Sequence, residues 1–532
     1  MAQISPARKT AFQILISVER GQSHSDDLLR GKAVNALSAP DRNLATALVL
    51  GVLRWQIQLD HQLQALLKRP NAKLDPEDRI ALRMGAFQLL HLDRIPARAA
   101  IDESVELARQ CGHRFASRMV NAVLRKMSKA SQTAEQLDSD SHSFQDTTSL
   151  VAEKLVECVS ERRFVSGRDF SRAVNATEST QALQATEKHI VLKGHDFSRA
   201  ISAAKSTGPL GPEGCFSESA SDLALAQAHP AWMVERWINL YGLDAAHAIC
   251  RHGQSQPVLA VRLATPEAEA ELAAEGIGLE PGELLTTART VVAGNVTATE
   301  AFRLGRVRLQ DEGSQLVAEL ASENLGQNVK SVLDACAAPG GKTLILAERN
   351  PQARIVACES SRTRIEQLRK RLASLGDRVE CRLADATALT EDSAFDLALA
   401  DVPCSGTGTL GRNPEIRHRL RPDDLTRQAE RQRAILLAAL RAVRPGGRVV
   451  YSTCSLEPEE NEQVVAAVLA ATPNARLIPL TPCIDELLRK GILTHLGAER
   501  LRACLTPEGS LRLLPGSFHT DGFFICMIER TA

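Results

Sequence analysis

The sequence predicts a multidomain protein in which an all-α bundle precedes an α/β domain built on a doubly wound, mostly parallel sheet. Three observations lead to this prediction. The chain has 532 residues, which corresponds to about three domains of ordinary size. Its first 130 residues carry apolar side chains at helical spacing. From residue 312 onward, strand-like and helix-like segments alternate, as a parallel sheet requires.

The composition is that of a soluble globular protein, with 44% hydrophobic and 24% charged residues. No apolar run approaches the roughly 18 residues of a membrane helix, and the N-terminus lacks an apolar signal core. We therefore expect a cytoplasmic protein with no membrane partner. The 64 basic and 64 acidic residues cancel, so net charge gives no sign of nucleic-acid binding, although a local basic face could contact phosphates.

The cysteine pattern indicates reduced thiols. The chain has twelve cysteines and no CxxC pair, so a zinc site is not expected. In a cytosolic chain most of these thiols should behave as small buried hydrophobes.

Residues 1–130 are predicted to form a compact helical bundle. Apolar residues recur at three and four positions, as at Leu44, Leu48 and Val52. The expected helices span residues 6–21, 41–67, 76–95, 97–112 and 113–127.

Residues 131–222 differ in composition from their surroundings. They are rich in serine and hold two similar segments, GRDFSRAVNATEST from Gly167 and GHDFSRAISAAKST from Gly194. Two copies are fewer than the about three units that a solenoid needs. We interpret the segment as an inserted, largely disordered linker; a peptide ligand for a partner is the alternative.

Ordered structure is expected again after the insert. Residues 223–311 predict a small α+β subdomain, with helices at 230–252 and 266–276 around a strand at 257–264. Residues 312–532 predict the sheet, with strands at 331–337, 354–359, 379–385, 395–402, 448–453, 510–515 and 522–529, and helices at 342–350, 361–376, 422–443 and 457–471.

Two short segments at the ends of neighbouring predicted strands carry the candidate chemistry. Asp401 and Cys404 follow one strand, and Cys454 follows the next. Residues just past the carboxyl ends of adjacent strands share one crevice. We therefore expect a nucleophile, a second thiol and an acid or base in one site. The alternative is that these cysteines are buried and inert.

A glycine turn after the first strand of the sheet indicates a cofactor loop. Residues 334–343 read DACAAPGGKT, and glycines let a backbone turn sharply and approach a ligand. A phosphate-binding P-loop is excluded because Cys336 stands where that motif needs glycine. GxGxxG is absent too, so a smaller adenosine ligand is favoured. Glu359 and Asp385 end the next two strands, where they could bind ribose and adenine; a helix cap or surface charge is the alternative.

Four segments resemble the S-adenosylmethionine-dependent RNA cytosine-C5 methyltransferases: DACAAPGGKT, ADVPCSGTGTLGRNPEIR, YSTCSLEPEENEQVV and RLLPGSFHTDGFF. The N-terminal bundle, with RNLATALVLGVLRW and VNAVLR, resembles a NusB-type RNA-binding domain. The combination is similar to the bacterial Sun/Fmu type, which methylates a cytosine in small-subunit (16S) ribosomal RNA. The resemblance covers about residues 1–130 and 225–532 and implies a class I methyltransferase with a Rossmann-like sheet.

The resemblance also implies roles for individual residues. Cys454 matches the nucleophile of the family and Cys404 its second, product-release cysteine. Asp401 would border both the cofactor and the target base. Glu359 would hold the ribose, where the family more often has Asp. Contacts to S-adenosylmethionine are implied for Cys336, Ala337, Ala338, Pro339, Gly340, Gly341, Lys342, Glu359, Arg364, Asp385 and Asp401.

One rival assignment makes Cys404 the nucleophile, because Pro-Cys is the nucleophile motif of DNA cytosine-C5 methyltransferases. A DNA or transfer-RNA substrate, and a non-catalytic ribosome-assembly or RNA-binding factor, are further alternatives. In the expected reaction, Asp401 would need a pKa raised by burial in an apolar site, so that it can share a proton with the base.

Other residues are candidates for contacts with RNA. We expect a monomer that binds small-subunit ribosomal RNA without a metal. Residues 458–460 are interpreted as a helix start. His519 and Asp521 precede the last strand and could contact the substrate; a turn is the alternative. Candidate phosphate contacts, with a solvated face as the alternative, are Arg8, Lys9, Arg42, Arg54, Arg125, Arg412 and Arg417.

Overall fold

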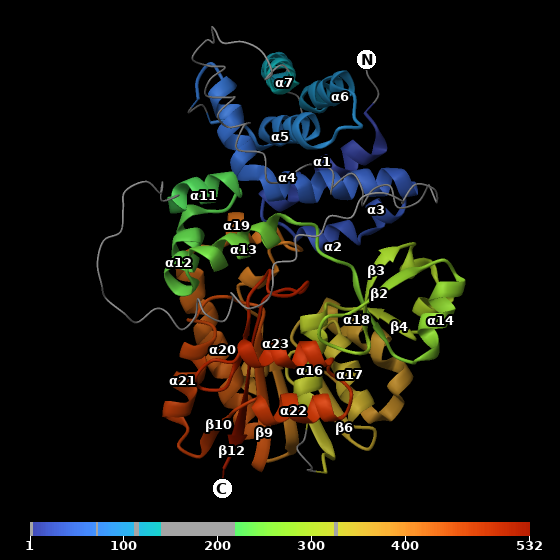
Figure 1. Cartoon of the computed structure of the whole chain (residues 1–532), viewed down its shortest axis with the longest axis vertical. Helices are drawn as coiled ribbons and strands as arrows, with labels where there is room; N and C mark the ends of the chain where they lie inside the picture. The colour runs from blue at the N-terminus through green and yellow to red at the C-terminus, as the bar shows by residue number, and fades with distance from the viewer. Residues whose placement is uncertain (1–3, 71–72, 111–115, 140–218, 324–327, 532) are drawn as a thin grey trace.

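The computed structural model describes residues 4–70, 73–110, 116–139, 219–323 and 328–531. A helical bundle lies above a large mixed sheet, and two smaller units fill the space between them (Figure 1). This architecture confirms the predicted fold class. Most of the predicted insert, residues 140–218, lies outside the described residues. No helix within the described ranges is long and apolar enough to span a membrane.

The bundle forms as its apolar periodicity predicts. Gly51 and Phe87 show how closely two of its helices approach, because a Cβ at Gly51 would lie 2.0 Å from the Phe87 ring. Two short helices between the first and second predicted ones were not anticipated, and the last helix runs past residue 130. The helices are α1 (Pro6–Glu19), α2 (Ser25–Leu29), α3 (Lys32–Asn35), α4 (Ala39–Leu66), α5 (Pro76–His91), α6 (Ala97–Gln110) and α7 (Ala116–Ser139).

Three helices connect the bundle to the rest of the chain: α11 (Ala220–Ala226), α12 (Ala231–Tyr241) and α13 (Leu243–Gln254). The single helix predicted for 230–252 is wrong. Gly242 has φ +85°, a left-handed conformation that ends α12 and begins α13. Only glycine adopts it at little cost.

A small antiparallel sheet follows, with strand order β2-β3-β1-β4. Only its first strand and first helix were predicted. Its elements are β1 (Ala260–Leu263), α14 (Glu267–Ala274), β2 (Gly278–Pro281), β3 (Ala288–Ala293), η2 (Val296–Ala298), α15 (Glu300–Arg303) and β4 (Val307–Leu309).

The large sheet has the order β10-β12-β9-β8-β5-β6-β7, with β11 paired to β12. The five strands from β9 to β7 are parallel, and β12 pairs in antiparallel fashion with β9, β10 and β11. The strands are β5 (Ser331–Asp334), β6 (Arg354–Glu359), β7 (Val379–Leu383), β8 (Phe395–Asp401), β9 (Val443–Thr453), β10 (Ala475–Ile478), β11 (Leu511–Leu513) and β12 (Phe523–Arg530).

The order of strands reverses between β5 and β8, because the chain passes through β6 and β7 before β8 pairs with the other side of β5. Ligands of open α/β sheets bind at such a reversal, outside the carboxyl ends of the strands. These ends point toward the helical bundle (Figure 1). The candidate site therefore lies between the sheet and the elements above it.

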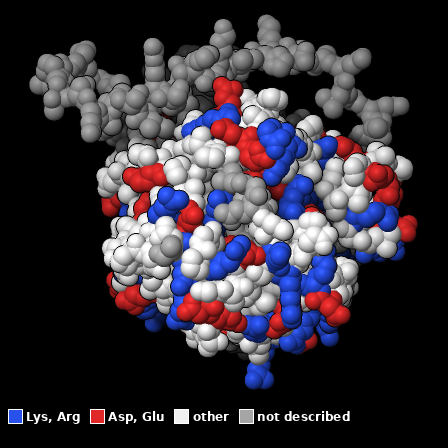
Figure 2. Space-filling view, turned by 90° about the horizontal axis from the view of Figure 1, so that it is seen from below, with Lys and Arg blue, Asp and Glu red and all other residues white. Residues whose placement is uncertain are grey.

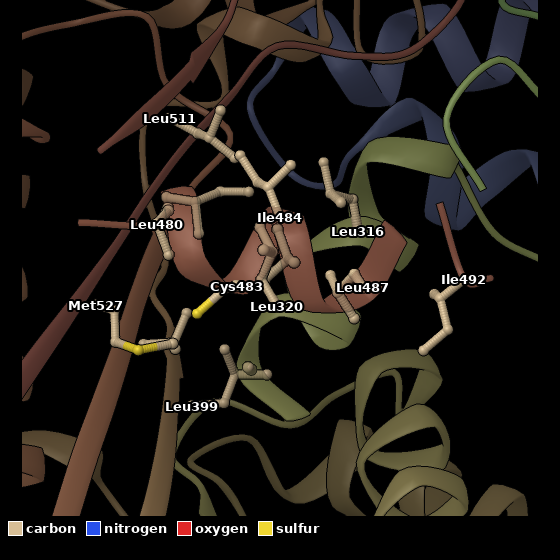
Figure 3. Close-up of a cluster of buried hydrophobic side chains, with 14 of the residues drawn as sticks. Leu316, Leu320, Leu399, Leu480, Cys483, Ile484, Leu487, Ile492, Leu511 and Met527 are labelled. Atoms are coloured by element: carbon tan, nitrogen blue, oxygen red, sulfur yellow. The ribbon is translucent and has the colours of Figure 1, made fainter. Parts of the chain in front are cut away.

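Helices cover both faces of the sheet. On one face, α16, α22 and α23 bury an apolar cluster that includes Leu320, Leu399, Ile484 and Met527 (Figure 3). On the other face, α20 and α21 pack against alternate residues of the same strands, such as Tyr451. The helices are α16 (Glu312–Ser322), α17 (Gly341–Arg349), α18 (Arg362–Leu372), η3 (Ala373–Arg378), η4 (Ala386–Ala388), η5 (Thr407–Thr409), α19 (Ile416–Arg419), α20 (Pro422–Ala442), α21 (Glu462–Ala471), α22 (Thr481–Arg489) and α23 (His495–Ala503).

The face seen from below carries Lys and Arg interspersed with Asp and Glu (Figure 2). This face lies opposite the carboxyl ends of the parallel strands (Figure 1). Neither sign of charge forms a continuous patch across the described residues of this face.

Candidate active site

The glycine loop joins β5 to α17 at the strand reversal. Gly340 has φ +99°, and a Cβ there would lie 2.9 Å from Cδ1 of Leu368. A Cβ on Gly341 would lie 3.2 Å from Oε1 of Gln310. Gly340 is therefore restricted to glycine by its backbone conformation and by space, whereas a side chain at Gly341 would require Gln310 to shift.

Carboxylates stand at the ends of the next two strands, as predicted. Glu359 is 5% exposed, and its Oε1 accepts a hydrogen bond of 2.8 Å from the amide of Ser361. Arg364 lies 3.5 Å from its Oε2 and donates to the carbonyl of Ala338 at 3.0 Å. Arg364 thus ties the glycine loop to the end of β6.

Asp385, after β7, is exposed. Its Oδ1 accepts from the amide of Thr387 at 3.0 Å, which lowers the pKa of Asp385. Glycine-loop backbone and carboxylates after successive strands of an open α/β sheet can approach an adenosine cofactor and accept hydrogen bonds from its hydroxyl and amine groups, as S-adenosylmethionine requires. The residues present therefore fit this cofactor.

Asp401 ends β8 beside the glycine loop. Its Oδ2 lies 2.8 Å from Nζ of Lys342, and its Oδ1 accepts from the Ser452 hydroxyl at 2.8 Å. The expected apolar surroundings of Asp401 are wrong, because this ion pair and hydrogen bond surround the carboxylate with polar groups. Burial lowers the pKa of Lys342, but Asp401 and, more weakly, Cys454 outweigh it and raise that pKa above its ordinary value.

The two predicted cysteines meet. Sγ of Cys404 lies 3.3 Å from Sγ of Cys454, although the residues are fifty positions apart in sequence. The contact with Cys454 and burial raise the pKa of Cys404 well above its ordinary value. Cys336 is also near the site, but burial raises its pKa and keeps it a neutral thiol.

The predicted helix start at 457–460 is wrong, because α21 begins at Glu462. Residues 458–461 instead form turns, and the carboxylates of Glu457 and Glu460 in this segment are fully buried. Glu457 pairs with Arg236 at 2.9 Å, and Glu460 accepts hydrogen bonds beside both cysteines. Acidic residues before a helix gave no signal of burial in the sequence.

Two arginines near the site have guanidinium groups engaged by other residues of the chain, so they are not free phosphate contacts. Arg412 pairs with Asp521 at 2.7 Å and with Asp311 at 2.8 Å. Arg417 is 2% exposed. The Asp521 carboxylate is held by Arg412 within the protein. His519, in contrast, is exposed beside Glu283.

Two of the proposed phosphate contacts in the bundle are likewise wrong. Arg8 is buried and bonded to Gln88 and Glu103, and Arg54 is buried and donates to the Gly411 carbonyl at 2.7 Å. Three candidates remain exposed: Lys9, Arg42 and Arg125. Within the described ranges, no group of three or more His, Cys, Asp or Glu side chains is arranged to hold a metal ion.

Comparisons with known proteins show to which family the chain is similar. The family model described as 16S rRNA methyltransferase RsmB/F matches residues 324–529, and the NusB family model matches residues 5–129. A Bacillus subtilis protein, the probable ribosomal RNA small subunit methyltransferase B, is 30% identical and aligns over 98% of both chains. The Pseudomonas putida ribosomal RNA small subunit methyltransferase B is 27% identical over 89% of this chain and 91% of its own.

The fold is also known from experiment. The crystal structure of PH0851 has a TM-score of 0.66 and 21% identity, and the alignment covers 99% of both chains. Fold and site together define an S-adenosylmethionine-dependent methyltransferase with a NusB domain. The chain belongs to the RsmB/F family of 16S rRNA methyltransferases.

Proposed function

We propose that this protein methylates C5 of a cytosine in 16S ribosomal RNA through a covalent bond between Cys454 and C6 of the base. The observation that carries the proposal is the contact of 3.3 Å between the sulfurs of Cys404 and Cys454, beside the pair of Asp401 and Lys342. Family membership supports the RNA substrate.

C5 of cytosine is a weak nucleophile, so the reaction needs prior activation of the ring. The Cys454 thiolate adds its electron pair to C6, and the electrons of the C5–C6 double bond then become available at C5. This is covalent catalysis, in which one difficult step becomes two easier ones. S-adenosylmethionine, when bound, supplies an electrophilic methyl group that C5 accepts as the sulfonium becomes a neutral thioether.

Asp401 and Lys342 act on the ring during this addition. Asp401 accepts a hydrogen bond from the base, directly or through a proton shared with N3. The ammonium of Lys342, 2.8 Å from Asp401, offsets the negative charge that the ring gains. Fixed charges of this kind need no reorganisation during the reaction.

Release of the product reverses the addition. A base removes the proton from C5, the C5–C6 double bond forms again, and the bond between C6 and Cys454 breaks to free the thiolate. The Cys404 sulfur, in contact with that of Cys454, is placed to assist this step. Because the target base must leave any stack to expose C6, we expect a looped or single-stranded RNA site.

The test is to trap the covalent intermediate. Cys404→Ala protein is incubated with 16S RNA and methyl-labelled S-adenosylmethionine and run on a denaturing gel, next to wild type, Cys454→Ala and the double variant. Cys381→Ala is the matched control, since it removes a partly buried thiol of β7. We expect a labelled protein–RNA adduct in Cys404→Ala that is lost in the double variant, and normal turnover in Cys381→Ala.

Other outcomes separate the alternatives. An adduct that survives loss of Cys454 would make Cys404 the nucleophile. Label incorporated into transfer RNA or DNA but not 16S RNA would move the substrate class, and chromatography of the digested RNA would show whether C5 carries the methyl group. If cofactor binds but no label reaches RNA and no adduct forms, the catalytic proposal fails in favour of a binding factor.

A further inference from the structure

Glu460 is a fully buried carboxylate that contacts the residue after each active-site cysteine. Its Oε1 accepts from the amide of Ser405 at 2.8 Å, and its Oε2 accepts from the Ser455 hydroxyl at 2.5 Å and from the Ser405 hydroxyl. Ser405 directly follows Cys404, and Ser455 directly follows Cys454. One side chain therefore joins the two loops that carry the thiols.

Neighbouring groups brace the same junction. The Gln432 amide donates to Oε1 of Glu460 at 2.9 Å and to the carbonyl of Pro403 at 2.9 Å. The hydroxyls of Ser405 and Ser455 lie 3.0 Å apart. The side chains in this network come from α20 and from the two loops that follow β8 and β9, so the carboxylate at its centre fixes the spacing between these loops.

Among the described residues, no cation pairs with the Glu460 carboxylate. The groups that donate to it are one backbone amide, two hydroxyls and one side-chain amide, all uncharged. A buried carboxylate is costly unless it is hydrogen-bonded in this way. By contrast, Glu457 nearby is paired with Arg236. Glu460 thus differs from Glu457 in that its described partners are all uncharged hydrogen-bond donors.

Opposite charges flank the two thiols. The interaction of Lys342 with a thiolate at Cys454 is favourable, and it contributes to the raised pKa of Lys342. On the other side, the pKa of Cys404 is raised by the contact with Cys454, by burial and by the charge of Cys454. The Glu460 carboxylate raises this pKa further, and the Gly406 amide opposes the rise. Tyr451 of β9 also faces Cys404, and α20 presents the uncharged Gln432.

We infer that Glu460 is a positioning residue that holds the two cysteine loops in contact and disfavours a thiolate at Cys404, so that Cys454 is the thiolate that attacks. The inference rests on the proposed function for its catalytic meaning. Its two physical parts, the spacing of the thiols and the protonation of Cys404, can each be measured without RNA or cofactor.

The first experiment measures protonation. Cys454→Ala protein, with and without Glu460→Gln, is alkylated with iodoacetamide over a range of pH, and modification of the Cys404 peptide is followed by mass spectrometry. We expect the half-maximal pH to fall in the Glu460→Gln variant and to stay high in Glu460→Asp, which keeps the charge. Glu462→Gln, two residues away and paired with Arg512 on the surface, is the matched control and should not shift.

The second experiment measures spacing. Diamide, a thiol oxidant, accepts two electrons and two protons as Cys404 and Cys454 form a disulfide, which peptide mass spectrometry detects. We expect slower crosslinking in Glu460→Asp than in wild type or Glu462→Gln. If circular dichroism shows that Glu460 variants do not fold, Ser455→Ala, which keeps the carboxylate and removes one of its donors, should also crosslink more slowly.

An alkylation profile for Cys404 that is unchanged by Glu460→Gln, or crosslinking that keeps the wild-type rate in Glu460→Asp and Ser455→Ala, would overturn the inference. Neither result would depend on methyl transfer. The adduct experiment could then still succeed, so failure of the inference and failure of the proposed function remain distinguishable.

Discussion

The ammonium group of Lys342, in the first turn of α17, lies 2.8 Å from the carboxylate of Asp401 at the end of β8. The same nitrogen lies 5.8 Å from the centre of the Phe523 ring. One side chain thus connects the glycine loop, the strand that precedes Cys404 and the antiparallel strand β12. A cation in this position can balance charge on a substrate ring only if Asp401 keeps it oriented.

Replacing Lys342 by methionine should remove that charge while filling a similar volume. We expect single-turnover methyl transfer to fall by about a hundredfold to a thousandfold, the usual loss for one preorganised electrostatic contact. Lys330→Met is the control, because Lys330 is an exposed lysine at the start of β5. Equal rates in the two variants would show that the ion pair has no part in catalysis.

Glu359 offers a test of the cofactor site that does not involve RNA. Glu359→Ala removes a buried acceptor at the end of β6, and loss of a hydrogen bond to a charged group corresponds to about a tenfold to hundredfold weaker binding. Titration calorimetry with S-adenosylhomocysteine measures the change. Glu366→Ala, at a position 63% exposed on α18, should leave affinity unaltered; equal affinities in both variants would remove Glu359 from the ribose site.

The convergence of Asp401, Cys404 and Cys454 could be predicted because it follows from topology. Alternating strands and helices predict a parallel sheet, and a parallel sheet aligns the carboxyl ends of its strands. No knowledge of packing is needed for that step. The same reasoning placed the glycine loop and Glu359 at one edge of the sheet.

The roles of Arg54, Arg417 and Glu460 could not be predicted, because a charged residue has the same sequence pattern whether it is solvated or enclosed. Arg417 and Arg54 are buried where separate parts of the chain meet, and only the tertiary structure defines that junction. Gly242 illustrates a second limit: apolar spacing continues on both sides of it, so periodicity alone favoured one helix where the backbone makes two.

Asp334 predicts a pH dependence of stability. It is buried at the end of β5 and accepts from the Thr343 hydroxyl at 2.7 Å. Burial raises its pKa to about 7. The folded protein therefore retains a proton that the unfolded chain loses near pH 4, and this group reduces stability as pH rises from about 4 to about 7.

Asp334→Asn should abolish that contribution, since asparagine is neutral throughout. We expect the melting temperature of the variant, relative to wild type, to rise between pH 5 and pH 7 and then to level off. The corresponding free energy changes by at most about 1.4 kcal/mol for each pH unit. Asp377→Asn, in the surface turn before β7, is the control. A constant difference between Asp334→Asn and wild type would mean that Asp334 is already ionised at pH 5.

Arg417 joins three parts of the chain by hydrogen bonds to backbone carbonyls. Its guanidinium donates to Arg54 of the bundle at 3.2 Å, to Ala228 at 3.3 Å and to Gly253 at 3.0 Å. Burial and, less strongly, the charge of Arg54 lower its pKa to about 9, so it is still a cation at neutral pH. The carbonyls that it contacts are buried with it.

Arg417→Met should therefore destabilise the whole protein rather than the site alone. The Arg54 carbonyl keeps a donor in the Gln254 amide, but the carbonyls of Ala228 and Gly253 would lose theirs. Each buried carbonyl left without a donor costs about 1 to 3 kcal/mol, so we expect a loss of at least about 2 kcal/mol of unfolding free energy. Thermal denaturation measures the change, and limited proteolysis should cut the variant faster between the helical bundle and the sheet domain. Arg427→Met, which removes a guanidinium 72% exposed on α20, should alter stability by about 0.5 kcal/mol or less. If the two variants melt at the same temperature, Arg417 does not join the bundle to the sheet domain.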